Sequence, residues 1–141
     1  MFRFSLESVL KLDRQLEDRV KIKLGQTLVR YNQQVFLLEA LNAELVKVQD
    51  QFRLSQGTDV DGLRQLHNFS LFMRDKIEQQ TKNVQQAEQE VQKVKRELLE
   101  ARREVRKLER LKEKRLEDYK YDEQRREQRI LDEIAAGRFN R

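Results

Sequence analysis

The feature that most constrains this chain is a run of apolar residues spaced alternately three and four positions apart. The run is clearest in the second half, at Val84, Ala87, Val91, Val94, Leu98, Ala101, Val105 and Leu108. This heptad pattern puts apolar side chains along one side of an α-helix and is typical of coiled coils. The same register extends backward through Leu63, Leu66, Ser70, Met73, Ile77 and Gln80. It predicts one long amphipathic helix in this half of the chain.

The first half carries an apolar stripe of its own, with steps of three or four residues. Its members are Leu24, Leu28, Tyr31, Val35, Leu38, Leu41, Leu45, Val48 and Phe52. Nearer the N-terminus, Leu6, Leu10, Leu16 and Val20 continue the stripe, and Asp13 interrupts it. This spacing predicts a second amphipathic helix.

Residues that break helices are rare and clustered. The 141 residues include no proline and four glycines, and two of these glycines lie in the polar segment 55–62. We expect a single coiled-coil domain over 1–141, with a helix at 5–54, a loop at 55–62, a helix at 63–136 and a short tail at 137–141. In an alternative, 61–73 forms a separate short helix.

Several residues have the spacing of helix caps. Ser5 is the predicted N-cap of the first helix, with Phe4 and Val9 as a hydrophobic staple. Thr58 and Asp61 resemble a capping box for the second helix, and Gly137 is a candidate C-cap.

A short loop between two such helices predicts antiparallel neighbours. The expected fold class is therefore all-α, a long antiparallel two-helix coiled-coil hairpin. Because the loop is centred near 58–59, facing residues should have numbers that add up to about 117. The second helix is the longer one and should overhang the first from about Glu113 onward.

The composition argues against catalysis. The chain has no cysteine and a single histidine, His67, so it has no pair for nucleophilic catalysis and no thiolate zinc site. We expect no catalytic, cofactor-binding or metal-binding residues and therefore no enzyme. The longest apolar run, Val35–Leu38, is too short to span a membrane. Acidic residues near the N-terminus argue against a targeting signal, so we expect a cytoplasmic protein.

The segment 93–115 is basic, with 11 basic and 5 acidic residues. It fits the exterior of a charged coiled coil, a docking site for an acidic protein surface, or a nucleic-acid site. Base stacking needs aromatic residues, and the sequence has none between Phe72 and Tyr119. We therefore expect no nucleic-acid partner.

Aromatic residues flank the predicted loop, at Phe52, Phe69 and Phe72, together with Met73. They form either a local apolar plug that closes the hairpin or an exposed patch for a partner.

The two ends of the chain carry the more specific motifs. The opening Phe2-Arg3-Phe4-Ser5-Leu6-Glu7-Ser8-Val9-Leu10 resembles the start of the flagellar FliJ family. The segment Glu127-Gln128-Arg129-Ile130-Leu131-Asp132-Glu133-Ile134-Ala135-Ala136-Gly137-Arg138-Phe139 resembles its C-terminal signature.

This resemblance implies a component of flagellar type III protein export, with a coiled coil similar to the central stalk of rotary ATPases. In the family, the paired terminal ends enter the hexameric export ATPase FliI and promote its assembly and activity. The loop end faces the cytoplasmic part of the export gate protein FlhA, and export chaperones also bind. The implied location is the cytoplasmic face of the inner membrane at the flagellar base, with only peripheral membrane contact.

Two sets of residues follow from the resemblance. The ATPase-binding candidates are Phe2, Phe4, Leu6, Leu131, Ile134 and Phe139. The export-gate candidates are Leu41, Leu45, Val48, Phe52, Phe69, Met73, Lys76 and Gln80. From the heptads alone, the alternative function is a generic coiled-coil scaffold or chaperone-type adaptor without an ATPase partner.

Overall fold

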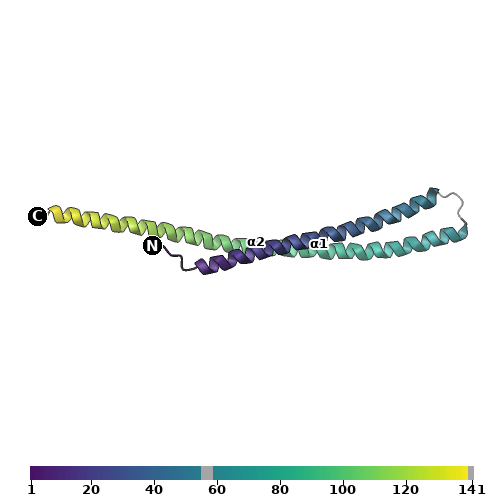
Figure 1. Ribbon diagram of the computed structural model, residues 1–141, viewed down its shortest axis with the longest axis horizontal. Helices are drawn as coiled ribbons and strands as arrows, with labels where there is room; N and C mark the ends of the chain where they lie inside the picture. The colour runs from purple at the N-terminus through teal and green to yellow at the C-terminus, as the bar shows by residue number, and fades with distance from the viewer. Residues whose placement is uncertain (55–58, 140–141) are drawn as a thin grey trace. The chain divides into compact units, whose positions relative to one another are not determined.

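In the computed structural model, the chain folds into two helices, α1 (Glu7–Leu54) and α2 (Val60–Phe139). The structure describes residues 1–54 and 59–139, with side chains up to Arg138. The helices lie side by side and run in opposite directions (Figure 1). This confirms the predicted all-α antiparallel hairpin with a longer second helix.

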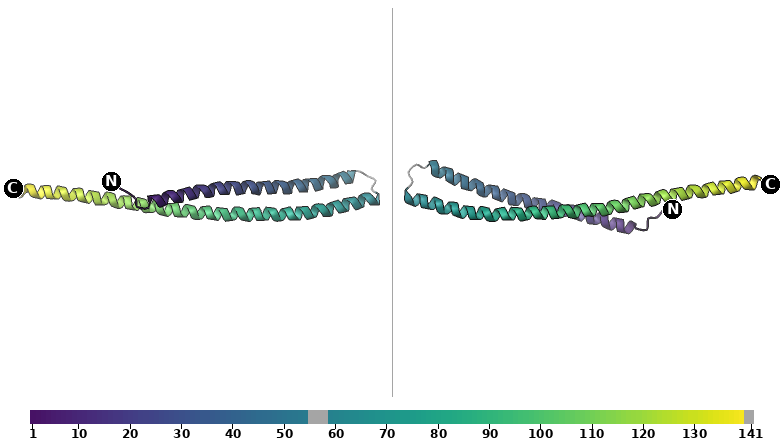
Figure 2. Two further views of the ribbon diagram at one scale, coloured as in Figure 1. Left: turned by 60° about the horizontal axis from the view of Figure 1, so that its bottom comes forward. Right: turned by 180° about the vertical axis from the view of Figure 1, so that it is seen from behind.

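The contacts divide the chain into two compact units. The terminal unit consists of Met1–Arg19 and Leu99–Arg141, and the loop unit is Val20–Leu98. Each unit pairs a segment of α1 with an antiparallel segment of α2. The two views in Figure 2 agree that these segments lie side by side in the loop unit. The expectation of a single domain stays a prediction.

A heptad seam joins the helices within each unit. On α2, the buried seam residues are Met73, Gln80, Val91, Val94, Leu98, Ala101 and Val105. On α1, the more buried residues follow alternating steps of four and three, at Leu6, Leu10, Asp13, Glu17, Val20, Leu24, Thr27 and Tyr31. Leu10 and Val94 have no exposed surface, so each unit has a fully buried layer.

Three leucines that the sequence placed in the seam are exposed. Leu63 keeps the heptad register near the start of α2 but is 49% exposed, whereas the other two lie outside the register. Leu16 is 52% exposed and Leu28 is 37% exposed, and Glu17 and Thr27 take the inward positions. A two-helix seam keeps a period of 3.5 residues, and a step to Leu16 or Leu28 would break that period. The prediction of these two seam positions was wrong because it followed apolar residue type instead of a constant register.

The register of the hairpin lies close to the predicted one. Lys23 pairs with Glu97 and Gln80 with Gln34 in the loop unit, and Arg14 pairs with Glu109 in the terminal unit. The residue numbers of these pairs add up to between 114 and 123, against an expected value of about 117.

Helix α2 begins at an aspartate cap. The Gly62 amide donates to Asp59 Oδ1 at 2.9 Å, and the Leu63 amide donates to the Asp59 carbonyl at 3.2 Å. From Val60 the helix continues unbroken through 61–73, so the structure has no separate short helix there. The predicted cap Thr58 and the rest of 55–58 lie outside the described residues.

Helix α1 begins at Glu7, two residues after the predicted start. The Ser5 hydroxyl is 2.7 Å from Arg115 Nη1, which donates to it, and Val9 is exposed. The Leu10 amide donates to the Leu6 carbonyl at 2.9 Å, so the helix begins after Ser5 and Ser5 is not its N-cap. Phe4 is buried and packs near Arg115. The chain before Glu7 is anchored on α2 instead.

Helix α2 continues to Phe139, so Gly137 lies within the helix and does not cap it at residue 136. The overhang also starts later than predicted. The N-terminal segment reaches Tyr119, and residues 121–138 of α2 are exposed.

Candidate partner-binding surfaces

The N-terminal segment packs on α2 within the terminal unit. Phe4 is only 8% exposed, and the Arg115 guanidinium lies 5.6 Å from its ring centroid. The Phe2 ring lies 5.6 Å from the Tyr119 ring at an angle of 48°, which is favourable aromatic geometry. Two of the predicted ATPase-binding residues, Phe2 and Phe4, therefore pack against their own chain, and Leu6 is partly buried in the seam.

Ion pairs along the seam hold the same segment. Lys112 Nζ lies 2.9 Å from Glu7 Oε2, and Arg14 Nη2 lies 3.2 Å from Glu109 Oε1. Each pair joins α1 to α2, so the start of α1 is fixed against α2 by charge as well as by apolar packing.

Two polar contacts in this region shift the pKa of a group that takes part in them. The hydrogen bond from Lys112 lowers the pKa of the Glu7 carboxyl, with a further contribution from the Lys112 charge. The Tyr119 hydroxyl donates to Glu123 Oε1 at 2.6 Å, and this bond raises the pKa of Tyr119. Glu7 is the first residue of α1, and Tyr119 is the α2 residue that Phe2 contacts. Both groups therefore lie where the N-terminal segment packs on α2.

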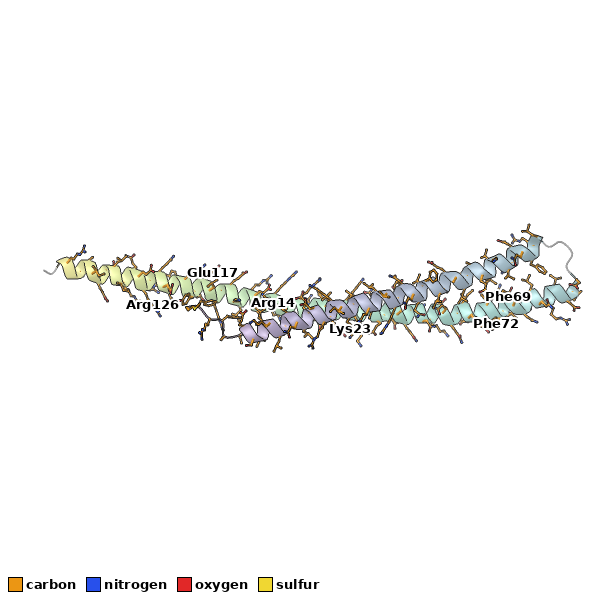
Figure 3. All side chains as sticks on the ribbon, viewed as in Figure 1. Arg14, Lys23, Phe69, Phe72, Glu117 and Arg126 are labelled. Atoms are coloured by element: carbon orange, nitrogen blue, oxygen red, sulfur yellow. The ribbon has the colours of Figure 1, made fainter. Side chains whose placement is uncertain are left out.

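The remaining C-terminal candidates lie on the part of α2 that extends past the start of α1. Glu117 and Arg126 mark this part in Figure 3. Leu131 and Ile134 are exposed here, together with their apolar neighbour Ile130. Phe139 is the last residue of α2, and its side chain lies outside the described residues.

An apolar patch on α1 was missed by the sequence analysis. Val9, Leu12 and Leu16 are exposed and share one side of the helix, because they lie three and four residues apart. A constant heptad register through Leu10, Asp13 and Glu17 would have identified them as outward-facing.

The predicted export-gate residues divide between the seam and the surface of the loop unit. Met73 and Gln80 are buried in the seam, whereas Lys76 is exposed. The other candidates are partly buried seam residues, at Leu41, Leu45, Val48, Phe52 and Phe69.

The exposed part of this region centres on Phe72, which the sequence had marked only as part of a plug or patch. Phe72 is exposed, and Lys76 Nζ lies 4.5 Å from its ring centroid, within cation–π range. Phe69 and Phe72 lie one turn apart on α2 (Figure 3). Met73 is therefore buried in the seam, whereas Phe72 belongs to an exposed patch.

Gln80 belongs to a polar layer across the seam. Its Nε2 donates to the Gln34 carbonyl and to Gln34 Oε1, both at 2.8 Å, and its Oε1 accepts from Asn83 Nδ2 at 3.3 Å. A buried amide that is satisfied in this way has a structural explanation, so the burial of Gln80 does not require a partner.

Two other kinds of site are absent from the described residues. Over 1–54 and 59–139, no group of three or more histidine, acidic or cysteine side chains could hold a metal ion. In the same ranges, neither helix has a segment long and apolar enough to cross a membrane.

Comparison with known proteins identifies a family. The family model described as "Flagellar FliJ protein" matches residues 2–141. Among solved structures, the chain is similar to a putative YscO homolog, CT670, from Chlamydia trachomatis, with a TM-score of 0.75 and 22% sequence identity. The match covers 96% of this chain and 93% of that one, and at this identity it shows a shared fold. The search of curated proteins found no match.

Proposed function

This chain belongs to the flagellar FliJ protein family and is a component of the type III export apparatus, and on this premise we propose that it is the stalk of the export ATPase. In this proposal its terminal unit enters the FliI hexamer, promotes its assembly and stimulates ATP hydrolysis. The role is one of binding and coupling, without catalysis by the chain itself. The resemblance carried by the terminal motifs is confirmed, while the contacts with FliI are part of the proposal.

The observation that carries the proposal is the exposed C-terminal part of α2. Residues 121–138 are all exposed, and among them Ile130, Leu131 and Ile134 cluster on adjacent turns. Exposed apolar residues that cluster in this way are typical of a protein–protein contact.

The α1 patch at Val9, Leu12 and Leu16 extends the proposed FliI surface. It belongs to the same terminal unit, and its residues are exposed. Phe2, Phe4 and Leu6 contribute by anchoring the N-terminal segment on α2, and Phe139 stays a candidate for direct contact.

The test is ATP hydrolysis by FliI, titrated with this protein at dilute ATPase. We expect stimulation that saturates well below one chain per ATPase subunit. The double variant Ile130→Ser/Ile134→Ser should need about tenfold more protein for half-maximal stimulation, because hot-spot residues carry most of an interface's energy.

The matched control is Leu63→Ser, which changes a similarly exposed leucine of α2 in the loop unit, outside the unit proposed to enter FliI. It should stimulate like the natural chain. Equal stimulation by the double variant, or no stimulation by the natural chain, would contradict the stalk proposal and favour a scaffold or adaptor without an ATPase partner.

We further propose that the loop unit binds the cytoplasmic part of FlhA through Phe72 and Lys76, with Leu71 beside them. Phe72 and Leu71 are exposed. The Lys76 ammonium lies over the Phe72 ring, and this contact favours one arrangement of the Lys76 and Phe72 side chains. The buried candidates Met73 and Gln80, and the partly buried seam residues, would support this surface from beneath. Export chaperones are proposed as further partners, and the proposed location is the cytoplasmic face of the inner membrane at the flagellar base.

The FlhA contact can be tested by calorimetric titration of the FlhA cytoplasmic region with this protein. Phe72→Ala should weaken binding about tenfold or more, whereas Leu63→Ala, a change at another exposed apolar residue of α2, should not. Equal affinities for the two variants would place the contact elsewhere.

A further inference from the structure

Helix α1 carries a second apolar line, on the side away from the seam. Ile22, Val29 and Phe36 follow one another at intervals of seven residues and are 64%, 56% and 70% exposed. Ala43 continues the series and is also exposed. All four lie in the loop unit, and none belongs to the surfaces proposed above for FliI or FlhA.

The spacing sets this line apart from scattered surface apolar residues. Single exposed apolar side chains are ordinary on proteins, but a line that repeats every seven residues faces one direction along a helix for several turns. The seam uses other positions, so packing of α1 on α2 does not explain the line. A shallow groove here is lined by Val29, Asn32, Gln33, Gln34, Phe36 and Leu37.

Charge along α1 changes sign near the middle of this line. Residues 21–33 contain three basic residues, Lys21, Lys23 and Arg30, and no acidic one. Residues 37–50 contain three acidic residues, Glu39, Glu44 and Asp50, and one basic one, Lys47. The apolar line therefore passes from a basic half to an acidic half.

From this pattern we propose that a second copy of this chain binds antiparallel along the outer side of α1. The basic half of each copy then lies opposite the acidic half of the other. With the two-fold axis between Asn32 and Gln33, Val29 of one copy comes opposite Phe36 of the other, and Ile22 comes opposite Ala43. The interface is self-complementary, as a two-fold dimer requires.

Gly25 fits the same arrangement. A glycine inside a helix lowers stability by about 1 kcal/mol relative to alanine. A Cβ atom added at Gly25 would have no neighbour within 4 Å, so packing inside the chain does not require the glycine. In the proposed dimer Gly25 lies opposite Ala40, where two small residues let the helices approach closely.

Sedimentation equilibrium of the purified full chain, without any partner, tests the proposal. We expect a monomer–dimer equilibrium with a dissociation constant of the order of 10 μM, because a pair of single helices forms an interface at the small end of the known range. Val29→Ser/Phe36→Ser should raise this constant at least tenfold. Both residues are exposed, so the fold should be kept, and circular dichroism will check this.

Leu63→Ser is the matched control, since it removes an exposed leucine of the same unit from α2 and belongs to none of the proposed surfaces. It should dimerise like the natural chain. A natural chain that stays monomeric up to several hundred micromolar, or equal dimerisation of the double variant and the natural chain, would overturn the proposal. If the natural chain stays monomeric, the apolar line is left as a contact surface for a different protein.

The chain has no cysteine, so single cysteines report the geometry without background. Gln33→Cys lies next to the proposed axis and should form a disulfide-linked dimer under mild oxidation, because the two Cα atoms come within bonding reach. Gln49→Cys lies on the same helix far from the axis and should crosslink at least tenfold more slowly. Equal crosslinking at the two positions would overturn the antiparallel arrangement.

Discussion

Polar side chains take several seam positions that apolar residues usually fill, and their contacts explain why. Thr27 is buried, and its hydroxyl donates to the Leu24 carbonyl at 2.9 Å. Glu17 faces inward, and its Oε1 lies 3.6 Å from Arg102 Nε. A buried polar group is costly only when it lacks a partner, so these residues can keep the heptad register without leaving unsatisfied groups.

Glu7 gives a prediction at this scale. Its pKa is lowered in the folded chain, so the paired carboxylate stabilises the fold above the carboxyl's ordinary pKa of 4.5. This stabilisation is lost as the pH falls through the lower folded-state pKa. Glu7→Gln should therefore lower the melting temperature near neutral pH, and the difference from the natural chain should shrink in acid. Thermal melts followed by circular dichroism between about pH 7 and pH 3 measure it; a difference that stays constant would contradict the assignment.

Asp59 gives a second residue-scale prediction. Asp59→Ala removes the carboxylate that accepts from the Gly62 amide, and it should lower the free energy of unfolding by about 1 kcal/mol. Asp59→Asn keeps an acceptor oxygen and should cost clearly less. Urea melts of both variants give the comparison, and equal losses would mean that the cap contributes through charge alone.

The sequence predicted the fold well because heptad spacing is a property of the whole helix. The antiparallel pairing and its approximate register followed from two stripes and one short loop. Single seam positions such as Leu16 and Leu28 could not be assigned from residue type, because the register of a long seam outweighs the preference of one side chain. The burial of Phe4 was also missed, since the contact over its ring comes from Arg115, more than a hundred residues away in the sequence.

At the scale of the elements, the polar layer of Gln80 and Gln34 fixes how α1 and α2 align in the loop unit. A polar residue at a seam position selects one register at some cost in stability. The double variant Gln34→Leu/Gln80→Leu, which replaces both partners by apolar side chains, should therefore raise the free energy of unfolding by about 1 kcal/mol. Gln80→Ala should lower it, because the alanine leaves a cavity and an unpaired Gln34. Urea unfolding of both variants measures the two shifts, and stabilisation by alanine would show that the layer is strained.

The outer line of α1 and the seam of α1 show why candidate sites were harder to predict than the fold. Both are apolar patterns on one helix, and sequence alone assigns each leucine, valine or phenylalanine to whichever stripe it fits. Burial separates them, because Leu24 and Leu38 are partly buried whereas Val29 and Phe36 are exposed. The residues proposed to bind partners are then the apolar positions that the hairpin does not bury.

For the whole molecule, stability and partner binding should be separable by truncation. Residues 121–138 are exposed, so a chain that ends at Lys120 loses little buried surface. We expect its melting temperature to lie within a few degrees of the natural value, and its stimulation of FliI to be lost. Removing residues 1–6 instead deletes Phe4 and Ser5 with their contacts to Arg115, and should lower the melting temperature clearly. A melting temperature of the Lys120 truncation far below the natural value would mean that the C-terminal part of α2 contributes to folding. Its exposed residues could then not be assigned to a partner alone.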